Sequence, residues 1–213
     1  MRRHYTFMDK ICLGLDQAVR ALTDTPKTTG AIYPAKGIEE PILSDEQRKH
    51  AAGLMRVNHA GEICAQALYH GQSVVSKTPE IEAHLQAAAL EEGDHLAWCK
   101  QRLDELNSHP TYLSPFWYMG SFSIGLMAGI IGDQWSLGFV AETERQVIQH
   151  LEKHLALLPA DDKRSYAILQ KMETDEAKHR DEAIESGAHE LPGPVKGLMG
   201  LASKVMVKTA YWI

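Results

Sequence analysis

The sequence predicts an all-α fold: a four-helix bundle built from two helical hairpins, with additional apolar and amphipathic helices. Three observations lead to this prediction. Apolar residues recur at helical spacing, and neither an alternating strand pattern nor an Asn-Gly or Asp-Gly hairpin signal is evident. Breaks rich in Pro and Gly divide the chain into segments of helix length. One arrangement of Glu and His occurs twice in the same order, 82 to 84 residues apart.

Composition narrows the class of protein. The 213 residues are 44% hydrophobic, which suits a single domain over 1–213 with one substantial core. A net charge of −6, without a Lys/Arg cluster interleaved with aromatics, argues against a nucleic-acid partner. The three cysteines lack C-x-x-C spacing, so reduced thiols in a cytoplasmic-type compartment are expected rather than disulfides or a zinc ribbon. The first ten residues, lacking a long apolar core, show no secretory signal.

The first hairpin follows an N-terminal segment, 1–43, that reads as a helix over 6–22 and a connecting loop with three prolines. Ser44 and Gln47 have the spacing of a capping box, which opens a helix expected to run to about Lys77. Pro79 suits the first turn of the next helix, which should end near Asn107.

The segment 110–132 carries no Asp, Glu, Lys or Arg and is about long enough to span a bilayer. It also contains Pro115 and several Gly and Ser. We therefore expect a buried or membrane-dipping helix rather than a full span.

The second hairpin should run from Asp133 to about Leu158 and from Asp162 to Ser186, which completes a bundle over 44–187. The last part, 188–213, has three lysines and no acid after Pro194, with apolar residues at helical spacing. It predicts a basic amphipathic helix suited to an anionic membrane surface. A terminal helix packed on the bundle with solvated lysines is the alternative.

The repeated arrangement consists of a lone Glu followed by Glu-x-x-His. Glu62 precedes Glu92 by 30 residues and Glu144 precedes Glu176 by 32, with the histidines three residues after the second Glu of each pair. About one Glu-x-x-His is expected by chance in this composition, so the spacing alone proves little. The six residues that lie on the apolar stripes of the predicted helices are Glu62, Glu92, His95, Glu144, Glu176 and His179.

Two packed hairpins would bring these six side chains together at mid-bundle. Four buried carboxylates need a counter-charge, and metal ions supply it. A Glu from each of two helices plus Glu-x-x-His from each of the other two is the ligand set of ferritin-like di-iron or di-manganese proteins. Carboxylate-rich donors favour two iron ions over zinc, although the ligands alone do not separate iron from manganese.

Within such a centre, Glu92 and Glu176 are the expected bridges. One ion would take Glu62 and His95, and the other Glu144 and His179. His59, Tyr69 and His154 lie on or near the same stripes and could orient ligands or pass protons, although each could equally be a satisfied core residue.

Four stretches together resemble the ubiquinone-biosynthesis family of 3-demethoxyubiquinol hydroxylases: Arg56-Val-Asn-His-Ala-Gly-Glu62, Tyr69-His-Gly-Gln72, Glu91-Glu-Gly-Asp-His95 and Asp175-Glu-Ala-Lys-His179. The resemblance runs from about Ser44 to the C-terminus. It implies a ferritin-like di-iron monooxygenase that hydroxylates the ring of a polyprenyl methoxy-benzoquinol with dioxygen, and it implies the same six ligands. Glu144 rather than Glu142 fits the family's spacing, and Asn58 stands where some relatives have Asp.

The resemblance also implies partners and a location. The expected partners are the quinol, dioxygen and an electron donor, either NADH or a reductase. The protein could also form a homo-oligomer or join a ubiquinone-biosynthesis complex. Peripheral attachment to the cytoplasmic face of the inner membrane is the expected location. A ferritin-like ferroxidase and a rubrerythrin-like peroxidase are the alternative functions.

Overall fold

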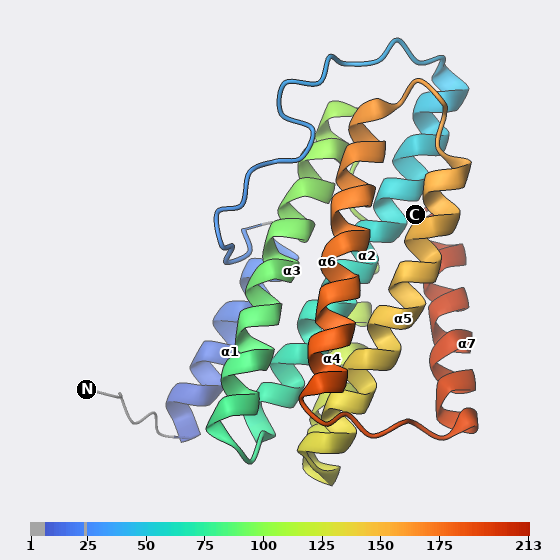
Figure 1. Ribbon diagram of the computed structural model, residues 1–213. Helices are drawn as coiled ribbons and strands as arrows, with labels where there is room; N and C mark the ends of the chain where they lie inside the picture. The colour runs from blue at the N-terminus through green and yellow to red at the C-terminus, as the bar shows by residue number, and fades with distance from the viewer. Residues whose placement is uncertain (1–6, 24) are drawn as a thin grey trace.

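The computed structural model describes residues 7–23 and 25–213, and all regular elements in these ranges are helices, as predicted (Figure 1). Residues 1–6, on which part of the expectation about a secretory signal depended, lie outside the described residues. The helices are α1 (Phe7–Leu22), α2 (Asp45–Val75), α3 (Pro79–Glu105), α4 (Ser114–Ile131), α5 (Asp133–Leu157), α6 (Lys163–Glu185) and α7 (Gly193–Ala210).

The capping box at the start of α2 is present. The Ser44 hydroxyl accepts from the Gln47 backbone N–H, and the Gln47 side-chain carbonyl accepts from the Ser44 backbone N–H. The helix ends at Val75, two residues before the predicted Lys77. There the Asp133 carboxylate accepts the backbone N–H groups of Lys77 and Thr78 at 3.1 Å each, which holds the turn in a non-helical conformation.

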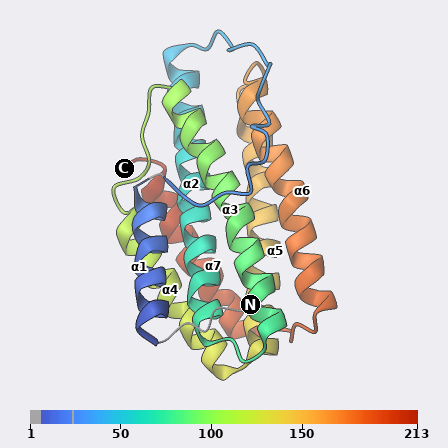
Figure 2. The same ribbon diagram turned by 90° about the vertical axis from the view of Figure 1, so that its left-hand side faces the viewer.

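Helices α2 and α3 form one antiparallel hairpin and α5 and α6 form the other, and the two hairpins dock side by side (Figures 1 and 2). The apolar core is divided along the bundle. Among the clusters of buried residues, one includes Trp98, Leu103 and Leu169, and another includes Leu85 and Leu137. The middle of the bundle, between these clusters, is where each helix carries its buried acidic residue.

The predicted charge-free segment forms α4, which connects the two hairpins and packs closely on α2. Glycines permit this approach, because a Cβ at Gly125 would collide with the carbonyl group of Leu68, and one at Gly71 with that of Phe122. Throughout the described part of the chain, no helix is both long enough and apolar enough to cross a membrane. The full-span alternative for 110–132 is therefore not supported.

The C-terminal helix α7 packs on α2 through Ala210 and Tyr211, whereas Leu198, Leu201 and Val205 are exposed by 50% or more. The loop before α2 is fixed on α3. The Asp94 carboxylate accepts the backbone N–H groups of residues 29–31, and the buried Arg102 guanidinium binds Glu40 at 3.0 Å. These contacts attach the loop to α3 at two positions about two turns apart.

Candidate metal centre

The six side chains predicted to converge lie together in the middle of the bundle, one or two from each helix of the hairpins. Glu62 comes from α2, Glu144 from α5, and the two Glu-x-x-His pairs from α3 and α6. Each of the six residues is at most 2% exposed. The hairpin register, with the lone Glu near the level of the pair on the next helix, produces this convergence.

The six residues form two overlapping groups. Ligand atoms of Glu62, Glu92, His95 and Glu176 lie within 4.8 Å of one another, and so do those of Glu92, Glu144, Glu176 and His179. Glu92 and Glu176 belong to both groups. If each group held one ion, these two carboxylates would be shared between the ions.

Both histidines direct Nδ1 toward the carboxylates. His95 Nδ1 lies 3.0 Å from Glu176 Oε1 and 3.5 Å from Glu62 Oε2, and His179 Nδ1 lies 3.2 Å from Glu92 Oε1. Each imidazole therefore offers one nitrogen to the cluster and keeps the other for a different partner.

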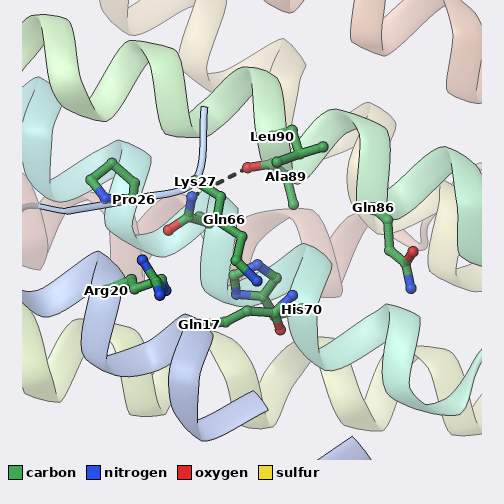
Figure 3. A pocket seen from close by; sticks show the side chains of 9 residues that line it. All are labelled: Gln17, Arg20, Pro26, Lys27, Gln66, His70, Gln86, Ala89 and Leu90. Carbon is green, nitrogen blue, oxygen red and sulfur yellow. Dashed lines mark hydrogen bonds between the residues drawn. The ribbon is translucent and has the colours of Figure 1, made fainter. Parts of the chain in front are cut away.

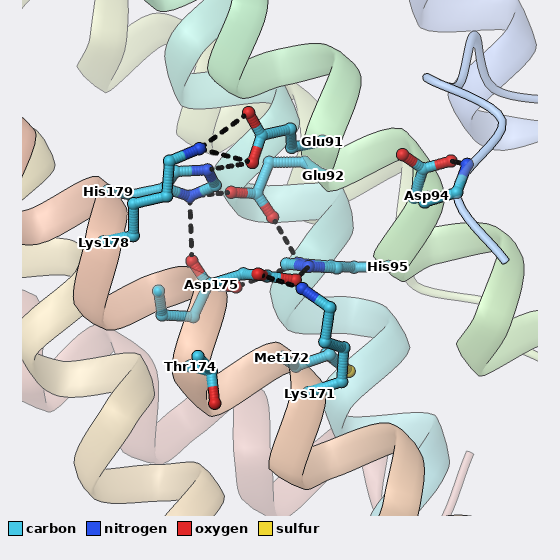
Figure 4. A network of polar contacts seen from close by, with 12 residues as sticks. Glu91, Glu92, Asp94, His95, Lys171, Met172, Thr174, Asp175, Lys178 and His179 are labelled. Atoms are coloured by element: carbon cyan, nitrogen blue, oxygen red, sulfur yellow. Dashed lines mark hydrogen bonds and ion pairs between the residues drawn. The ribbon is translucent and has the colours of Figure 1, made fainter. Parts of the chain in front are cut away.

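The other nitrogens are held by carboxylates of the opposite hairpin (Figure 4). His95 Nε2 donates to Asp175 at 3.2 Å, and His179 Nε2 donates to Glu91 at 3.1 Å. Lys171 pairs with Asp175, and Lys178 with Glu91. A carboxylate on the outer nitrogen fixes the imidazole's tautomer and orientation and makes Nδ1 a better ligand.

Burial dominates the electrostatics of the centre. It raises the pKa of Glu62 and of Glu144 well above the usual value for a carboxyl group. Burial also raises the pKa of Glu92, but the imidazoles of His179 and His95, 3.2 Å and 3.3 Å from its oxygens, lower it by a larger amount, so the net shift is downward. For His95, burial lowers the pKa, and the neighbouring Glu176 and Asp175 outweigh that effect and raise it. Without a cation, protons must balance these charges.

The residues fit a pair of hard cations. Neither carboxylate oxygen of Glu92 or Glu144 has a hydrogen-bond partner among the described residues, although these side chains are fully buried. Leaving such oxygens unpaired is costly, and metal ions would satisfy them. A donor set with mostly oxygen and one nitrogen per group suits iron or manganese rather than zinc. That these six residues bind iron stays a prediction.

The three additional candidates are all buried. His59 and Tyr69 lie in α2 on either side of Glu62, and the Tyr69 hydroxyl has no hydrogen-bond partner within the described ranges. His154 donates from Nδ1 to Asn58 Oδ1 at 2.8 Å. Glu142 is held away from the cluster by Arg145, at 2.6 Å.

An apolar cavity of about 360 Å³ extends from the cluster toward the surface. It includes Glu62, and its remaining lining comes from α2, α4, α5 and α7, for example Val57, Ile124, Phe139, Val147 and Met206. Phe116 and Ile124 both line it and are 71% and 40% exposed, so its outer edge is an exposed apolar surface. A Cβ at Gly61 would meet nothing within 4 Å, which leaves room beside Glu62.

A second hollow lies between α1, α2 and α3 and has a different character (Figure 3). It is lined by Arg20, Lys27, Gln66 and His70, and Gln66 donates to the carbonyl of Ala89 across its floor. Its volume of about 30 Å³ suits one or two water molecules rather than a substrate.

The sequence analysis missed Glu91 and Asp175 as partners of the histidines. A signal was available, because an acidic residue immediately precedes the glutamate of each Glu-x-x-His. In a helix that residue lies about 100° away from the ligand face, so it can reach a neighbouring helix. Which histidine each acidic residue contacts depends on how the two hairpins dock, and the spacing of residues along the chain does not determine that docking.

Comparisons with known proteins agree with this picture. Residues 49–210 match the family described as Ubiquinone biosynthesis protein COQ7. The chain is 52% identical to the 3-demethoxyubiquinol 3-hydroxylase of Nitrosococcus oceani, over 99% of each chain. It is 53% identical to the protein of the same name from Acinetobacter baylyi, over 99% of this chain and 100% of that one, and 49% identical to that from Legionella pneumophila.

A solved structure shares the fold at low sequence identity. A dodecameric thioferritin from Bacteroides fragilis superimposes with a TM-score of 0.52 at 16% identity, covering 65% of this chain and 84% of the other. This likeness shows the predicted ferritin-like fold alone.

Proposed function

The chain belongs to the family of the ubiquinone biosynthesis protein COQ7, and we propose from this premise that it is a 3-demethoxyubiquinol 3-hydroxylase. The reaction would insert one oxygen atom of dioxygen into the ring of a polyprenyl methoxy-benzoquinol, with an external donor, NADH or a reductase, supplying the electrons. The observation that carries the proposal is the apolar cavity between the buried carboxylate cluster and the exposed apolar edge of α4.

We propose that the cluster holds two iron ions, which would supply the activation of dioxygen. Glu92 and Glu176 would span the ions, Glu62 and His95 would hold one, and Glu144 and His179 the other. The side chains perform two tasks in this arrangement. They neutralise the cations in a site closed to water, and they keep both imidazoles fixed by the carboxylates of Asp175 and Glu91.

The cavity suits a ring attached to a hydrocarbon tail. Its volume lies within the range of small-molecule pockets, large enough for a substituted ring and the first part of a tail. Gly61 leaves space for the ring beside Glu62, and the apolar walls keep bulk water from the reacting carbon. The rest of the tail would leave past Phe116 and Ile124.

The two rival functions use the carboxylates but not the cavity. A ferroxidase oxidises ferrous ions that arrive from water and has no use for an apolar pocket of this size. A rubrerythrin-like peroxidase would need the cysteine-rich electron-transfer module, whereas the three cysteines here, Cys12, Cys64 and Cys99, are separate and free. A hydroxylase accounts for both the carboxylate cluster and the apolar cavity.

Peripheral attachment to the cytoplasmic face of the inner membrane is proposed together with this function. Met119, Met127 and Ile130 of α4 are 58% to 67% exposed, and α7 adds exposed apolar residues and the exposed Lys204 and Lys208. Exposed apolar side chains beside lysines favour an anionic lipid surface, where a polyprenyl quinol dissolves. A homo-oligomer is also proposed.

One product assay tests the proposed function. Iron-loaded protein receives a short-tail demethoxyubiquinol, a reductant and ¹⁸O₂, and the quinone product is examined by mass spectrometry. We expect one ¹⁸O atom per product ring. Oxidation of ferrous ions without ring product would support the ferroxidase, and peroxide consumption without ring product would support the peroxidase.

A vesicle-binding assay tests the location. We expect the double variant Phe116→Ser/Leu201→Ser to bind anionic vesicles at least about tenfold more weakly than the unmodified protein, because two large apolar contacts are removed. The control is Tyr166→Ser on α6, a 44% exposed aromatic away from α4 and α7. Equal binding by all three proteins would contradict the membrane proposal.

A further inference from the structure

The guanidinium of Arg56 joins α2 to the ends of two other helices that line the apolar cavity. Its Nη1 donates to the backbone carbonyl of Tyr211, directly after α7, at 2.8 Å. Its Nε donates to the carbonyl of His109 at 2.9 Å, and its Nη2 donates to the Ser108 hydroxyl at 2.7 Å. Both of these residues lie in the loop that leads into α4. One side chain therefore holds the end of α7 and the approach to α4.

The Tyr211 side chain adds to this attachment. Its hydroxyl lies 2.7 Å from His50 Nδ1, and His50 Nε2 donates to the carbonyl of Leu157 at 2.9 Å. The ring lies against α2 at Gly53, where an added Cβ would come within 2.6 Å of a ring carbon. A larger residue at position 53 would therefore displace the ring.

Helix α7 is fixed at its two ends, and its middle covers the cavity on the outside of the bundle (Figure 1). Before its first residue, the backbone N–H of His189 donates to the carbonyl of Gln134 at 2.9 Å, and Leu191 is 4% exposed. The residues of α7 that line the cavity are Met199, Ala202, Ser203 and Met206. The wall that α7 contributes thus depends on attachments that lie beyond the cavity.

The rim of the cavity on α4 has a low point. Phe116, Gly120 and Ile124 are four residues apart, so they lie along one face of α4, and all three line the cavity. Gly120 is exposed, and a Cβ there would meet nothing within 4 Å. Between two large apolar side chains, this position leaves space for a hydrocarbon chain to leave the cavity.

Arginine is the side chain that can make the Arg56 attachment. Its planar guanidinium presents several donors in a fixed fork, and here three nitrogens bond three oxygens from two segments at once. Lysine has one nitrogen and cannot reach all three. Arg56 is 9% exposed, so oxygens that lose their donor would be left poorly hydrated, and both segments would shift to regain partners.

We propose that Arg56 is a positioning residue for the substrate tail: it sets the separation of α4 and α7, and the tail leaves the cavity between them over Gly120. This assignment rests on the proposed function and adds to it the means by which a tailed ring is retained. The ring binds at the inner end, beside Glu62, and the tail binds between the outer helices. Loosening α4 and α7 removes apolar contacts from the tail and leaves those of the ring in place.

The test compares two probes on anaerobic, iron-loaded protein without reductant, where no turnover occurs. Both carry a methoxy-methyl-benzoquinone ring, with a prenyl tail on one and a methyl group in its place on the other. Dissociation constants are measured in one detergent, so that partition of the tailed probe into micelles is the same for every variant. We expect Arg56→Lys to weaken binding of the tailed probe about tenfold, with the tailless probe and the iron content little changed.

Two further measurements separate positioning from folding. Guanidinium ion added to Arg56→Ala should restore part of the binding of the tailed probe, whereas ammonium ion should not, because it lacks the planar fork. Gly53→Ala favours the helical state of α2 but displaces the Tyr211 ring, so it should also weaken the tailed probe selectively.

Each variant has a matched control. Gly197→Ala, at an exposed position of α7 with nothing near the new Cβ, should leave binding of both probes unchanged. Arg164→Lys alters another arginine that ties a loop to the bundle, through Glu105 and the carbonyl of Ile38, outside the cavity lining. It should lower stability without changing the ratio of the two dissociation constants.

The outcomes separate this inference from the proposed function. An unchanged ratio of the two dissociation constants in Arg56→Lys and Gly53→Ala, or equal losses for both probes, would overturn the assignment of Arg56 while ring hydroxylation by the unmodified protein persists. If the unmodified protein binds the tailed probe no better than the tailless one and forms no hydroxylated ring, the proposed function fails, and this inference fails with it.

Discussion

The carboxylate cluster has two unlike sides. Toward α3 and α6, the outer nitrogens of His95 and His179 are bound by Asp175 and Glu91, which are in turn paired with lysines at the surface. Toward α2 and α5, Glu62 borders an apolar cavity, and the oxygens of Glu144 have no hydrogen-bond partner within the described chain. The first side has the contacts that fix ligands. The second side has space for a substrate and carboxylate oxygens without hydrogen-bond partners, which a catalytic metal centre requires.

The largest effect should come from removing the cluster itself. We expect Glu92→Ala and His179→Ala to lower bound iron from about two per chain to below one and to reduce hydroxylation by more than the ~100-fold that outer partners of ligands contribute. Iron analysis and the product assay measure this. Glu142→Ala is the control, because that residue pairs with Arg145 outside the cluster. Full activity in either ligand variant would refute the site.

The paired side is tested by Glu91→Gln and Asp175→Asn. Each removes the charge that fixes one histidine while keeping the size of the side chain. We expect iron affinity to fall roughly 10- to 100-fold, measured by competition with a chelator. Lys171→Gln and Lys178→Gln, which alter only the exposed ends of the two networks, should have much weaker effects. If the lysine variants lost as much iron affinity as the carboxylate variants, the two networks would act only as surface charge and would not orient the histidines.

The cavity side is tested by Gly61→Leu. The side chain would enter open space beside Glu62 and occupy the position of the ring, so kcat/KM should fall about tenfold or more while iron content is retained. Melting temperature should hold or rise, because leucine favours a helix more than glycine does. The control is Gly197→Leu, on the exposed face of α7, which should raise helix stability in the same way without filling the cavity. Undiminished turnover by Gly61→Leu would place the ring elsewhere.

The smallest effect concerns acid stability on the cavity side. His150 has a pKa of about 4, lowered first by burial, so the unfolded chain binds its proton at a higher pH than the folded protein does. Folding stability must then fall as pH drops from 7 toward 4. We expect the iron-free protein to lose about 1 kcal/mol more than His150→Gln between pH 7 and 5, measured by urea unfolding. His109→Gln, at an exposed position, should behave as the parent does.

The two sides also differ in how far the sequence predicted them. The positions of Glu62, Glu92, Glu144 and Glu176 followed from helical periodicity and hairpin length, which are arithmetic properties of the chain. The capping box at Ser44 was also predictable, because it depends on residues three apart.

The cavity could not be predicted in this way. It depends on where α4 and α7 dock against α2, and that docking is set by close backbone approach at Gly71 and Gly125. Glycines in a charge-free segment suggest tight packing without naming the partner helix. Side-chain partners across helices depend on tertiary docking rather than on local pattern.

Each hairpin supplies the carboxylate that orients the histidine of the other hairpin, and this arrangement affects the abundance of the protein in the cell. Because each histidine is oriented by the opposite hairpin, neither half can hold an oriented ligand set by itself. Cations that bind only the docked state stabilise docking by mass action, about 2.7 kcal/mol when free metal exceeds its Kd a hundredfold. If the cations are iron, as proposed, iron scarcity would loosen the hairpins and expose the chain to proteolysis. The abundance of the protein would then follow iron supply even at a constant rate of synthesis.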